Sequence, residues 1–238
     1  MPRLPRAVAT AVTLTACVAA TTTSCEPEGP PPVPRPGVLT EAELRSVLPS
    51  GTDIPGYVVK PHSPPTATPH TAIPSKVSPD TPQACQALVD FRLNHEPPRP
   101  AARVPAEIWP RDDTSGKRDF KKLHSVVLSS HTVEEASAVV DSLKKAVPLC
   151  GEFLVYTLNY GDQDARIRIG RRPAPPAGDD SVAFDWTVPG IAMNTTVPVT
   201  VVRTGGVLTA YSGAVPAKIL RKQHEKLRAF ISGQITRP

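Results

Sequence analysis

The sequence has few of the signatures that mark an enzyme. It contains no GxSxG nucleophile elbow, HExxH zinc motif, P-loop or glycine-rich dinucleotide fingerprint. Its six histidines are scattered, and the segment His131-Thr-Val-Glu-Glu has no second histidine with which to hold zinc. Asp179 and Asp180 could act as an acid and a base, but such residues before a strand are more typical of a turn. We therefore expect no catalytic residues, no cofactor and no metal site.

Strong charge of one sign and paired cysteine motifs are missing as well. Without Arg3 and Arg6, 25 of the 27 Lys and Arg residues remain against 22 Asp and Glu, which gives a net charge of +3. So weak a field argues against a nucleic-acid binder, whereas attraction to anionic lipid headgroups or wall polymers is compatible with it. The four cysteines form no CxxC pair, which argues against a thiol redox site.

The N-terminal segment is typical of an exported bacterial lipoprotein. Arg3 and Arg6 precede the uncharged run Ala7–Ala20, which is too short to span a bilayer but suits an export signal. Within it, Leu14-Thr15-Ala16-Cys17 resembles the lipobox, whose cysteine takes a diacylglyceryl group. We interpret residues 1–24 as a lipoprotein signal peptide, cleaved before Cys17 or Cys25. The expected location is the outer face of the cell membrane.

Two cysteines compete for the lipid. Leu, Thr and Ala before Cys17 match what a lipoprotein signal peptidase accepts, while Thr22-Thr23-Ser24 before Cys25 does not. Acylation of Cys25 would leave Cys85 and Cys150 as an even pair, whereas acylation of Cys17 leaves Cys25 as an odd thiol in an oxidising compartment. We favour Cys17, with Cys25 as the alternative and secretion without lipid as the third interpretation.

A proline-rich spacer follows the signal. Residues 26–37 read EPEGPPPVPRPG, with six prolines in twelve residues, which favours extended polyproline II and offers little apolar surface for folding. We interpret residues 25–38 as a tether, which at about 3.1 Å per residue could reach roughly 40 Å. Residues 39–238 then suit a single domain with a substantial core.

The pattern within residues 39–238 predicts an α+β fold. Capping boxes at Thr40/Glu43 and Thr132/Glu135 predict helix starts, and residues 62–79, rich in Pro, Thr and Ser, indicate a surface excursion. Apolar spacing places a second helix after Pro82, a stripe of Val133, Ala136, Val140, Leu143 and Val147 on the third, and a last helix after Pro216. We expect strands near residues 57–60, 123–129, 153–159, 165–169, 181–188, 197–203 and 207–212. Gly205-Gly206 suits a two-residue hairpin turn with positive φ. The expected architecture is one antiparallel sheet covered by helices.

Two constellations qualify as candidate sites. Cys85, on the second helix, and Cys150, after the third, suit a disulfide that spans about 65 residues, although two separate buried thiols would fit the same positions. Arg166, Arg168, Arg171 and Arg172 come from one strand and its exit, where guanidinium groups could hold phosphates of a lipid headgroup or wall polymer. The simpler interpretation of the arginines is a solvated sheet face.

The order of these elements resembles actinobacterial lipoproteins related to the PknH-like extracellular sensor domain. The resemblance rests on the two cysteine-bearing helices, on Gly178-Asp-Asp-Ser-Val-Ala-Phe184, on Val199-Thr-Val-Val-Arg-Thr-Gly205, and on Gln223 and Lys226-Leu227 in the last helix. It covers roughly Val38 to Arg237. It implies an antiparallel sheet with packed helices, a cleft for an extracellular ligand and no catalytic residues. This chain departs from the family pattern in having one expected disulfide instead of two, and neither a kinase domain nor a transmembrane helix.

The sequence thus predicts a noncatalytic, sensor-like or ligand-binding domain held at the membrane by an N-terminal lipid. Its partner would be a small molecule, an envelope component or a membrane protein, and not nucleic acid. An envelope protein-interaction module is the alternative, and an envelope hydrolase is a more distant one. A pocket lined by mixed side chains would favour ligand binding, a flat apolar patch would favour docking, and a nucleophile beside a base would favour hydrolysis.

Overall fold

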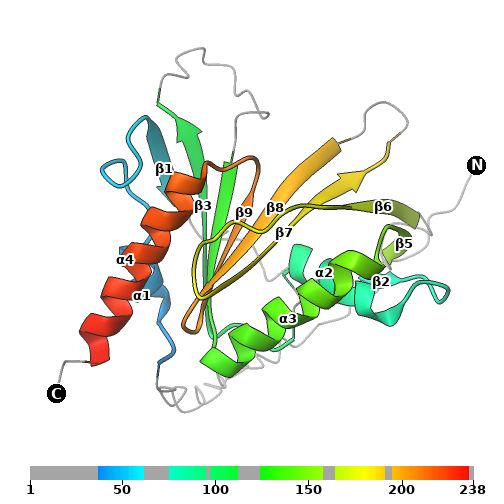
Figure 1. The fold of residues 1–238 in the computed structure, drawn as a ribbon, viewed down its shortest axis with the longest axis horizontal. Coiled ribbons are helices and arrows are strands. Elements are labelled where there is room, and N and C mark those ends of the chain that lie inside the picture. The colour runs from blue at the N-terminus through cyan, green and yellow to red at the C-terminus, as the bar shows by residue number, and fades with distance from the viewer. Residues whose placement is uncertain are drawn as a thin grey trace, which may run out of the picture. The chain divides into compact units, whose positions relative to one another are not determined.

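One antiparallel sheet organises the described part of the chain, which comprises residues 37–61, 75–94, 97–111, 124–157, 164–190 and 195–235 of a computed structural model. Within these ranges nine strands hydrogen-bond in a single sheet (Figure 1). In order across the sheet, they are β1 (Tyr57–Pro61), β3 (Ala102–Pro110), β4 (His124–Ser130), β9 (Val207–Ser212), β8 (Thr195–Thr204), β7 (Asp180–Val188), β6 (Asp164–Arg171), β5 (Glu152–Thr157) and β2 (Ser75–Val77). With helices packed on this sheet, the α+β fold class is the one that the sequence predicts.

The helices begin where the capping residues predict. They are α1 (Glu41–Ser46), the 3-10 turn η1 (Gln83–Cys85), α2 (Gln86–Arg92), α3 (Val133–Leu149) and α4 (Ala217–Ile235). At α3, the Thr132 hydroxyl accepts a hydrogen bond from the Glu135 N–H at 3.2 Å, and the Glu135 carboxylate accepts one from the Thr132 N–H at 2.9 Å. The same reciprocal box closes the start of α1 at Thr40 and Glu43. Both predicted boxes are confirmed.

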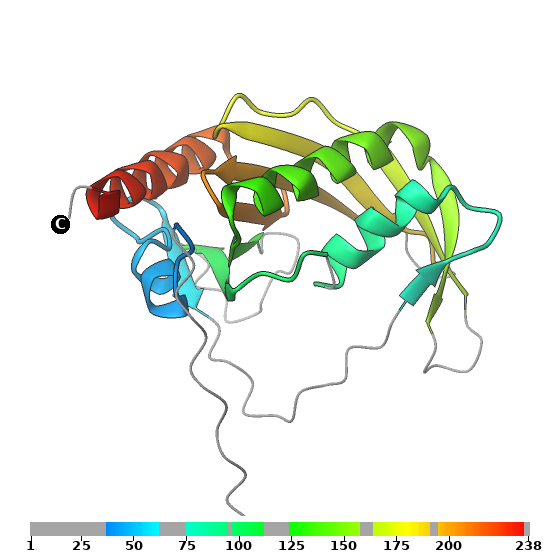
Figure 2. The same cartoon turned by 90° about the horizontal axis from the view of Figure 1, so that it is seen from below.

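Two hydrophobic clusters form on opposite faces of the sheet. Alternate residues of β8 separate them, because Val199 and Val201 belong to the first cluster and Val202 to the second. The first cluster packs α2 and α3 against β5 to β9, and the second packs α1 and α4 against β3, β4 and β9. Figure 2 shows α2 and α3 side by side along one half of the sheet, with α4 next to α1. α2 and α3 therefore cover one half of the sheet on one face, and α1 and α4 cover the other half on the opposite face.

Hydrogen bonds join α4 to the end of α1. The Gln223 amide donates to the Val47 carbonyl at 2.8 Å, and the Lys226 ammonium donates to the Leu48 carbonyl at 2.7 Å and to Asp53 at 2.9 Å. These bonds satisfy carbonyls that the short α1 leaves without an intrahelical partner. The first and last helices of the domain thus form one unit.

The buried face of α3 differs from the predicted stripe at one end. Its buried side chains are Ala136, Val139, Val140, Leu143 and Ala146, while Val133 is 48% exposed. Val133 is the first helical residue, where the chain has only just left the sheet at Ser130. The apolar face therefore starts one turn later and shifts toward Val139.

Two strands were not predicted from the sequence. β3 contains Pro105, which lacks the N–H of a regular ladder and argues against a strand in the interior of a sheet. The structure accommodates Pro105 because the pairing of β1 with β3 ends at Pro61 and Ala106, so β1 does not reach it. The short β2 lies within the predicted surface excursion, where it pairs with β5. Residues 62–74 of that excursion lie outside the described ranges.

The predicted hairpin joins β8 to β9 with Gly205 and Gly206 between the paired Thr204 and Val207. Gly205 has φ +57°, the left-handed conformation that favours glycine. Gly206 is needed for a different reason, since a Cβ there would overlap the carbonyl group of His131. The turn thus packs against the loop that opens α3.

Candidate functional site

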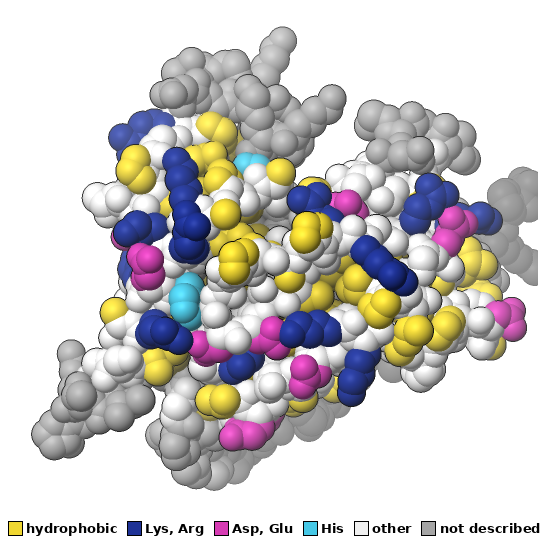
Figure 3. Space-filling model, viewed as in Figure 1, with side chains coloured by type: hydrophobic (Ala, Val, Ile, Leu, Met, Phe, Trp, Pro, Cys, Tyr) yellow, Lys and Arg dark blue, Asp and Glu magenta, His cyan; other side chains and the backbone are white. Residues whose placement is uncertain are grey.

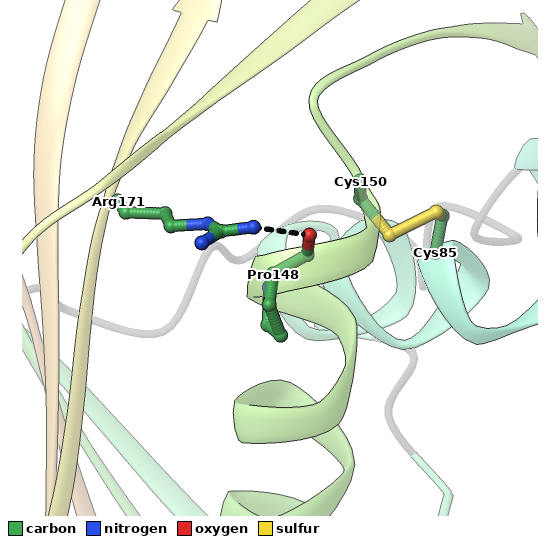
Figure 4. Close-up of a disulfide and its surroundings, with 4 residues drawn as sticks. All are labelled: Cys85, Pro148, Cys150 and Arg171. Atoms are coloured by element: carbon green, nitrogen blue, oxygen red, sulfur yellow. Dashed lines mark hydrogen bonds between the residues drawn. A yellow bond between two sulfur atoms is a disulfide. The ribbon is translucent and has the colours of Figure 1, made fainter.

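A disulfide joins the two cysteines of the domain. Cys85 in η1 and Cys150 after α3 have an S–S distance of 2.04 Å and a Cα–Cα distance of 5.7 Å (Figure 4). Both residues are buried, at 0% and 2% exposure, so the bond belongs to the core between α2 and α3. The alternative of two separate thiols does not apply. Cys17 and Cys25 lie outside the described residues.

Arg166 and Arg168 share one carboxylate. Arg166 Nη1 lies 2.9 Å from Glu152 Oε1, and Arg168 Nη2 lies 3.0 Å from Glu152 Oε2, across the pairing of β5 with β6. Hydrogen bonds from Arg168 and Arg166 hold the pKa of Glu152 below its ordinary value. Both arginines are more than half exposed, so this is a solvated ion-pair network on the sheet surface.

The other two candidate arginines have partners elsewhere. Arg172 lies 3.1 Å from Asp185 on β7. Arg171 alternates to the face of Ile167 and Ile169, which pack under α3, and donates to the Pro148 carbonyl at 2.7 Å (Figure 4). The structure brings Arg166 and Arg168 together but separates Arg171 from them. Anion binding by these four residues stays a prediction from the sequence.

The charged side chains on the face seen in Figure 3 are interspersed, with Lys and Arg spread among Asp and Glu instead of gathered in one patch. Asp179 and Asp180 each have a cationic partner. Asp179 accepts from the Gly205 N–H at 2.7 Å and from Arg228 at 2.9 Å, and Asp180 forms an ion pair with Lys144 of α3. Burial raises the pKa of each carboxyl, but the hydrogen bonds and neighbouring cations outweigh it, so both pKa values lie below the ordinary value. Both carboxylates are thus held by donors and cations where β7 begins.

His131 lies buried beside a serine. Its side chain is 1% exposed, and Nε2 lies 3.2 Å from the Ser129 hydroxyl, while Nδ1 has no hydrogen-bond partner among the described residues. Burial lowers the pKa of His131 to about 4; the charge of Glu135 raises it and that of Arg103 lowers it further. The imidazole is therefore neutral at physiological pH. Within the described ranges, no three His, Cys, Asp or Glu side chains are grouped to hold a metal ion.

A pocket opens on the sheet next to this pair. The space within it is about 430 Å³ when the open solvent at its mouth is counted. Its walls come from the end of α2, from β3 and from three adjacent strands, and the lining residues are Phe91, Arg92, Asn94, Arg103, Val127, Ser129, Val199, Ala210 and Ser212. The strand residues share one face, because Val127 pairs with Ala210, and Val199 with Ser212. This is the face that α2 and α3 cover elsewhere.

The pocket residues escaped the sequence analysis because they come from five separate elements. Arg92 is the last residue of α2, two positions before Asn94, which takes φ +62°, and Arg103 lies on the strand that was not predicted. Ser129 was placed in a predicted strand, but nothing in the sequence gives the register that sets it near β9. The prolines between Arg92 and Arg103 indicate a loop, but they do not predict that the two arginines line one pocket.

The described chain is thus an α+β domain whose sheet bears an open pocket with two arginines. Over the described residues, no helix combines the length and apolar character that crossing a membrane requires. No protein-family model matches the chain, and no curated protein matches it. Among solved structures, it is similar to the crystal structure of the extracellular domain of PknH from Mycobacterium tuberculosis, at 14% sequence identity and a TM-score of 0.48, over 83% of this chain and 97% of that one. At this identity the likeness assigns no role to any residue.

Proposed function

We propose that this chain is an extracytoplasmic lipoprotein whose domain binds a small molecule without chemically changing it. Three parts make up the proposal: export, anchoring by an N-terminal lipid on Cys17 or Cys25, and binding in the pocket between α2 and the sheet. The pocket is the observation that carries it. The sequence-based alternative of a protein-docking module has less support, since the large apolar side chains that are exposed among the described residues come from scattered elements.

The disulfide supports export. Cys85 and Cys150 are bonded and buried in the α2–α3 core, and such structural disulfides persist in oxidising compartments and are rare in a reducing cytosol. The lipobox-like Leu14–Cys17 and the proline-rich residues 25–38 support the anchor and its tether. Peptide mass mapping of the protein from its own host's membrane tests this part. We expect a diacylglyceryl mass on Cys17 or Cys25, and an unmodified mature N-terminus would contradict it.

The pair of Ser129 and His131 supports a noncatalytic role. A serine nucleophile needs a base that accepts its proton and a third group that orients the base. The His131 imidazole holds a proton weakly, with its pKa lowered to about 4, and its Nδ1 lacks the hydrogen bond that an orienting carboxylate would supply. This pair is better suited to holding a hydroxyl group in place than to activating it.

Ligand retention tests the binding function. The full chain, purified gently from its host's envelope, should carry a small-molecule mass in native mass spectrometry. Ala210→Phe should abolish the retained mass because the larger side chain fills the pocket, whereas Ala229→Phe, on the exposed side of α4, should not. Retention that is equal in both variants would place the ligand elsewhere. An empty wild-type protein that also ignores all added small molecules would overturn the binding function.

A further inference from the structure

Every polar side chain that lines the pocket can donate hydrogen bonds. Arg92 and Arg103 carry guanidinium groups, which only donate, and Ser129 and Ser212 carry hydroxyls. Asn94 already uses its carbonyl oxygen to accept from Arg103, which leaves its NH₂ group to donate. None of the described lining residues is a carboxylate. A set of donors around a concave surface matches a ligand group that only accepts, which is the property of an ionised carboxylate or phosphate.

Arg92 gives the strongest indication of a negative ligand group. Its guanidinium has no hydrogen bond or ion pair within the described residues, and the protein atoms around it partly desolvate it, which lowers its pKa without an acidic neighbour to compensate. The residue is exposed, so water reaches its charged end in the absence of a ligand. The C-terminal end of α2 offers a partial negative charge of about half a unit, which does not satisfy five N–H donors. An oxyanion in the pocket would replace water at these donors.

His131 determines which way the Ser129 hydroxyl donates. The neutral imidazole carries one proton, and on Nδ1 that proton would be a buried N–H without an acceptor. On Nε2 it is donated to Ser129 Oγ, 3.2 Å away. With its oxygen occupied as an acceptor, Ser129 is left with its own O–H to donate to a further acceptor. His131 is thus a positioning residue, because it orients the Ser129 O–H toward the pocket and does not itself contact the ligand.

The floor of the pocket is apolar. Val127, Val199 and Ala210 come from β4, β8 and β9 and lie on one face of the sheet, with Phe91 of α2 at the side. A fully hydrated ion such as inorganic phosphate would leave this surface without a partner. A ligand with a hydrocarbon portion would cover it and gain the free energy of removing apolar area from water.

We propose that the pocket selects a small organic anion, with a carboxylate or phosphate group between Arg92, Arg103 and Ser129 and an apolar body over Val127, Val199 and Ala210. The proposal rests on the ligand-binding function and names the class of ligand. The same chemistry occurs in free organic acids and in the headgroup region of anionic lipids. Water-soluble probes and vesicles distinguish these two sources.

Ligand-observed NMR titration of the full chain in phosphatidylcholine nanodiscs tests the ligand class. The probes are phenyl phosphate and benzoate, with benzyl alcohol as the uncharged counterpart and inorganic phosphate as the headgroup alone. We expect one or both aromatic anions to bind about tenfold more tightly than either control, which is the size of one charge-assisted hydrogen bond. Equal binding of benzyl alcohol and the anions would overturn the proposal.

Matched variants locate the site. Arg92→Gln should weaken binding of the anionic probe about tenfold while leaving benzyl alcohol unaffected, because glutamine keeps much of the size but loses the charge. Arg166→Gln, at an exposed arginine outside the pocket, should change nothing. Loss of binding in Arg166→Gln with none in Arg92→Gln would overturn the assignment and favour the β6 arginines. A long-range ¹H–¹⁵N spectrum should show His131 protonated on Nε2; protonation on Nδ1 would overturn the orientation of Ser129.

The remaining outcomes separate this inference from the binding function. If the aromatic anions fail but the protein retains a neutral molecule that Ala210→Phe removes, the binding function stands and the anion assignment is wrong. If neither the anions nor a retained molecule is found, both are wrong. Binding to vesicles that contain phosphatidylglycerol, sensitive to Arg92→Gln and displaced by phenyl phosphate, would identify the anion as a lipid headgroup. Binding of the water-soluble anions with no binding to these vesicles would identify a free organic acid.

Discussion

At the scale of single residues, Gly178 shows how closely two strands of this domain approach one another. Gly178 has φ +77°, and a Cβ there would overlap both the Arg203 carbonyl oxygen and the Val202 side chain. It lies directly before Asp179, which bonds to the hairpin turn at Gly205. The contact brings the start of β7 against the end of β8.

Gly178→Ala should therefore lower the free energy of unfolding by at least about 2 kcal/mol, since it adds both a left-handed strain and a backbone overlap. Gly233→Ala is the matched control, because a Cβ at that helical position meets nothing within 4 Å. It should leave stability unchanged or raise it by about 0.5–1 kcal/mol. Urea denaturation measures both. Equal effects of the two substitutions would contradict the overlap at Gly178.

The buried His131 predicts a pH dependence of stability. In the folded protein its pKa is lowered from 6.5 to about 4, so between these values the unfolded chain binds a proton that the folded chain does not. The free energy of unfolding should fall by about 3 kcal/mol as the pH drops from 6.5 to 4. The half-buried His124, whose pKa burial also lowers, acts in the same direction.

The carboxylates affect stability over a lower pH range than His131 does. The pKa values of Asp53, Asp179 and Asp180 lie below 3.8 in the folded protein, so the stability that they contribute is lost at lower pH than that of His131. His131→Asn should flatten the stability profile between pH 6.5 and 4, whatever it does to absolute stability. A slope that the substitution leaves unchanged would show that His131 does not titrate in this range.

At the scale of elements, the disulfide is the bond that holds the α2 region to the end of α3. A cross-link over 65 residues restricts the unfolded chain by about 4 kcal/mol in the loop-entropy estimate. Cys85→Ser combined with Cys150→Ser should lose free energy of unfolding of this order in chemical denaturation. The difference from the wild type should disappear when the wild type is reduced. A variant that is as stable as the oxidised protein would contradict a structural role.

The join between α4 and α1 predicts a contrast between two lysines of one helix. Lys226→Met removes donors from the Leu48 carbonyl and from Asp53 and should cost about 1–2 kcal/mol of stability. Lys222→Met breaks an exposed ion pair with Glu225 and should cost less than about 0.5 kcal/mol. Thermal and urea unfolding compare the two. If Lys222→Met were the more damaging change, the α1–α4 contact would not be the stabilising one.

Helices and regular strands were predictable because their signals are local. The side chains of Thr132 and Glu135 form the capping box that starts α3. β9 has the bounds that alternation and the Gly205-Gly206 turn predict. β3 was not predictable, because Pro105 fits in a strand only at a position that the neighbouring β1 does not reach. The local sequence around Pro105 does not indicate where β1 ends. The pocket depends on that same strand and its register, so it could not be predicted either.

At the scale of the whole molecule, the second hydrophobic cluster draws on both ends of the domain. It includes Leu39 and Leu44 near the start and Ile219 and Leu227 in α4. A chain that ends at Pro216 should therefore lose cooperative unfolding, because one face of β3 and β4 would lack its cover. A chain that ends at Ile235 should keep it. Near-ultraviolet circular dichroism during urea titration measures both, and a cooperative transition in the shorter chain would contradict the role of α4.

The bond between Lys226 and the end of α1 also sets an order in time. The ammonium group and the Leu48 carbonyl are 178 positions apart, so α1 is synthesised long before the helix that secures it. At 5–20 residues per second, the delay amounts to roughly 10 to 35 s. Throughout that interval the Gln223 and Lys226 donors for the end of α1 have not been made. The contact between the first and last helices of the domain can therefore form only after α4 has been synthesised.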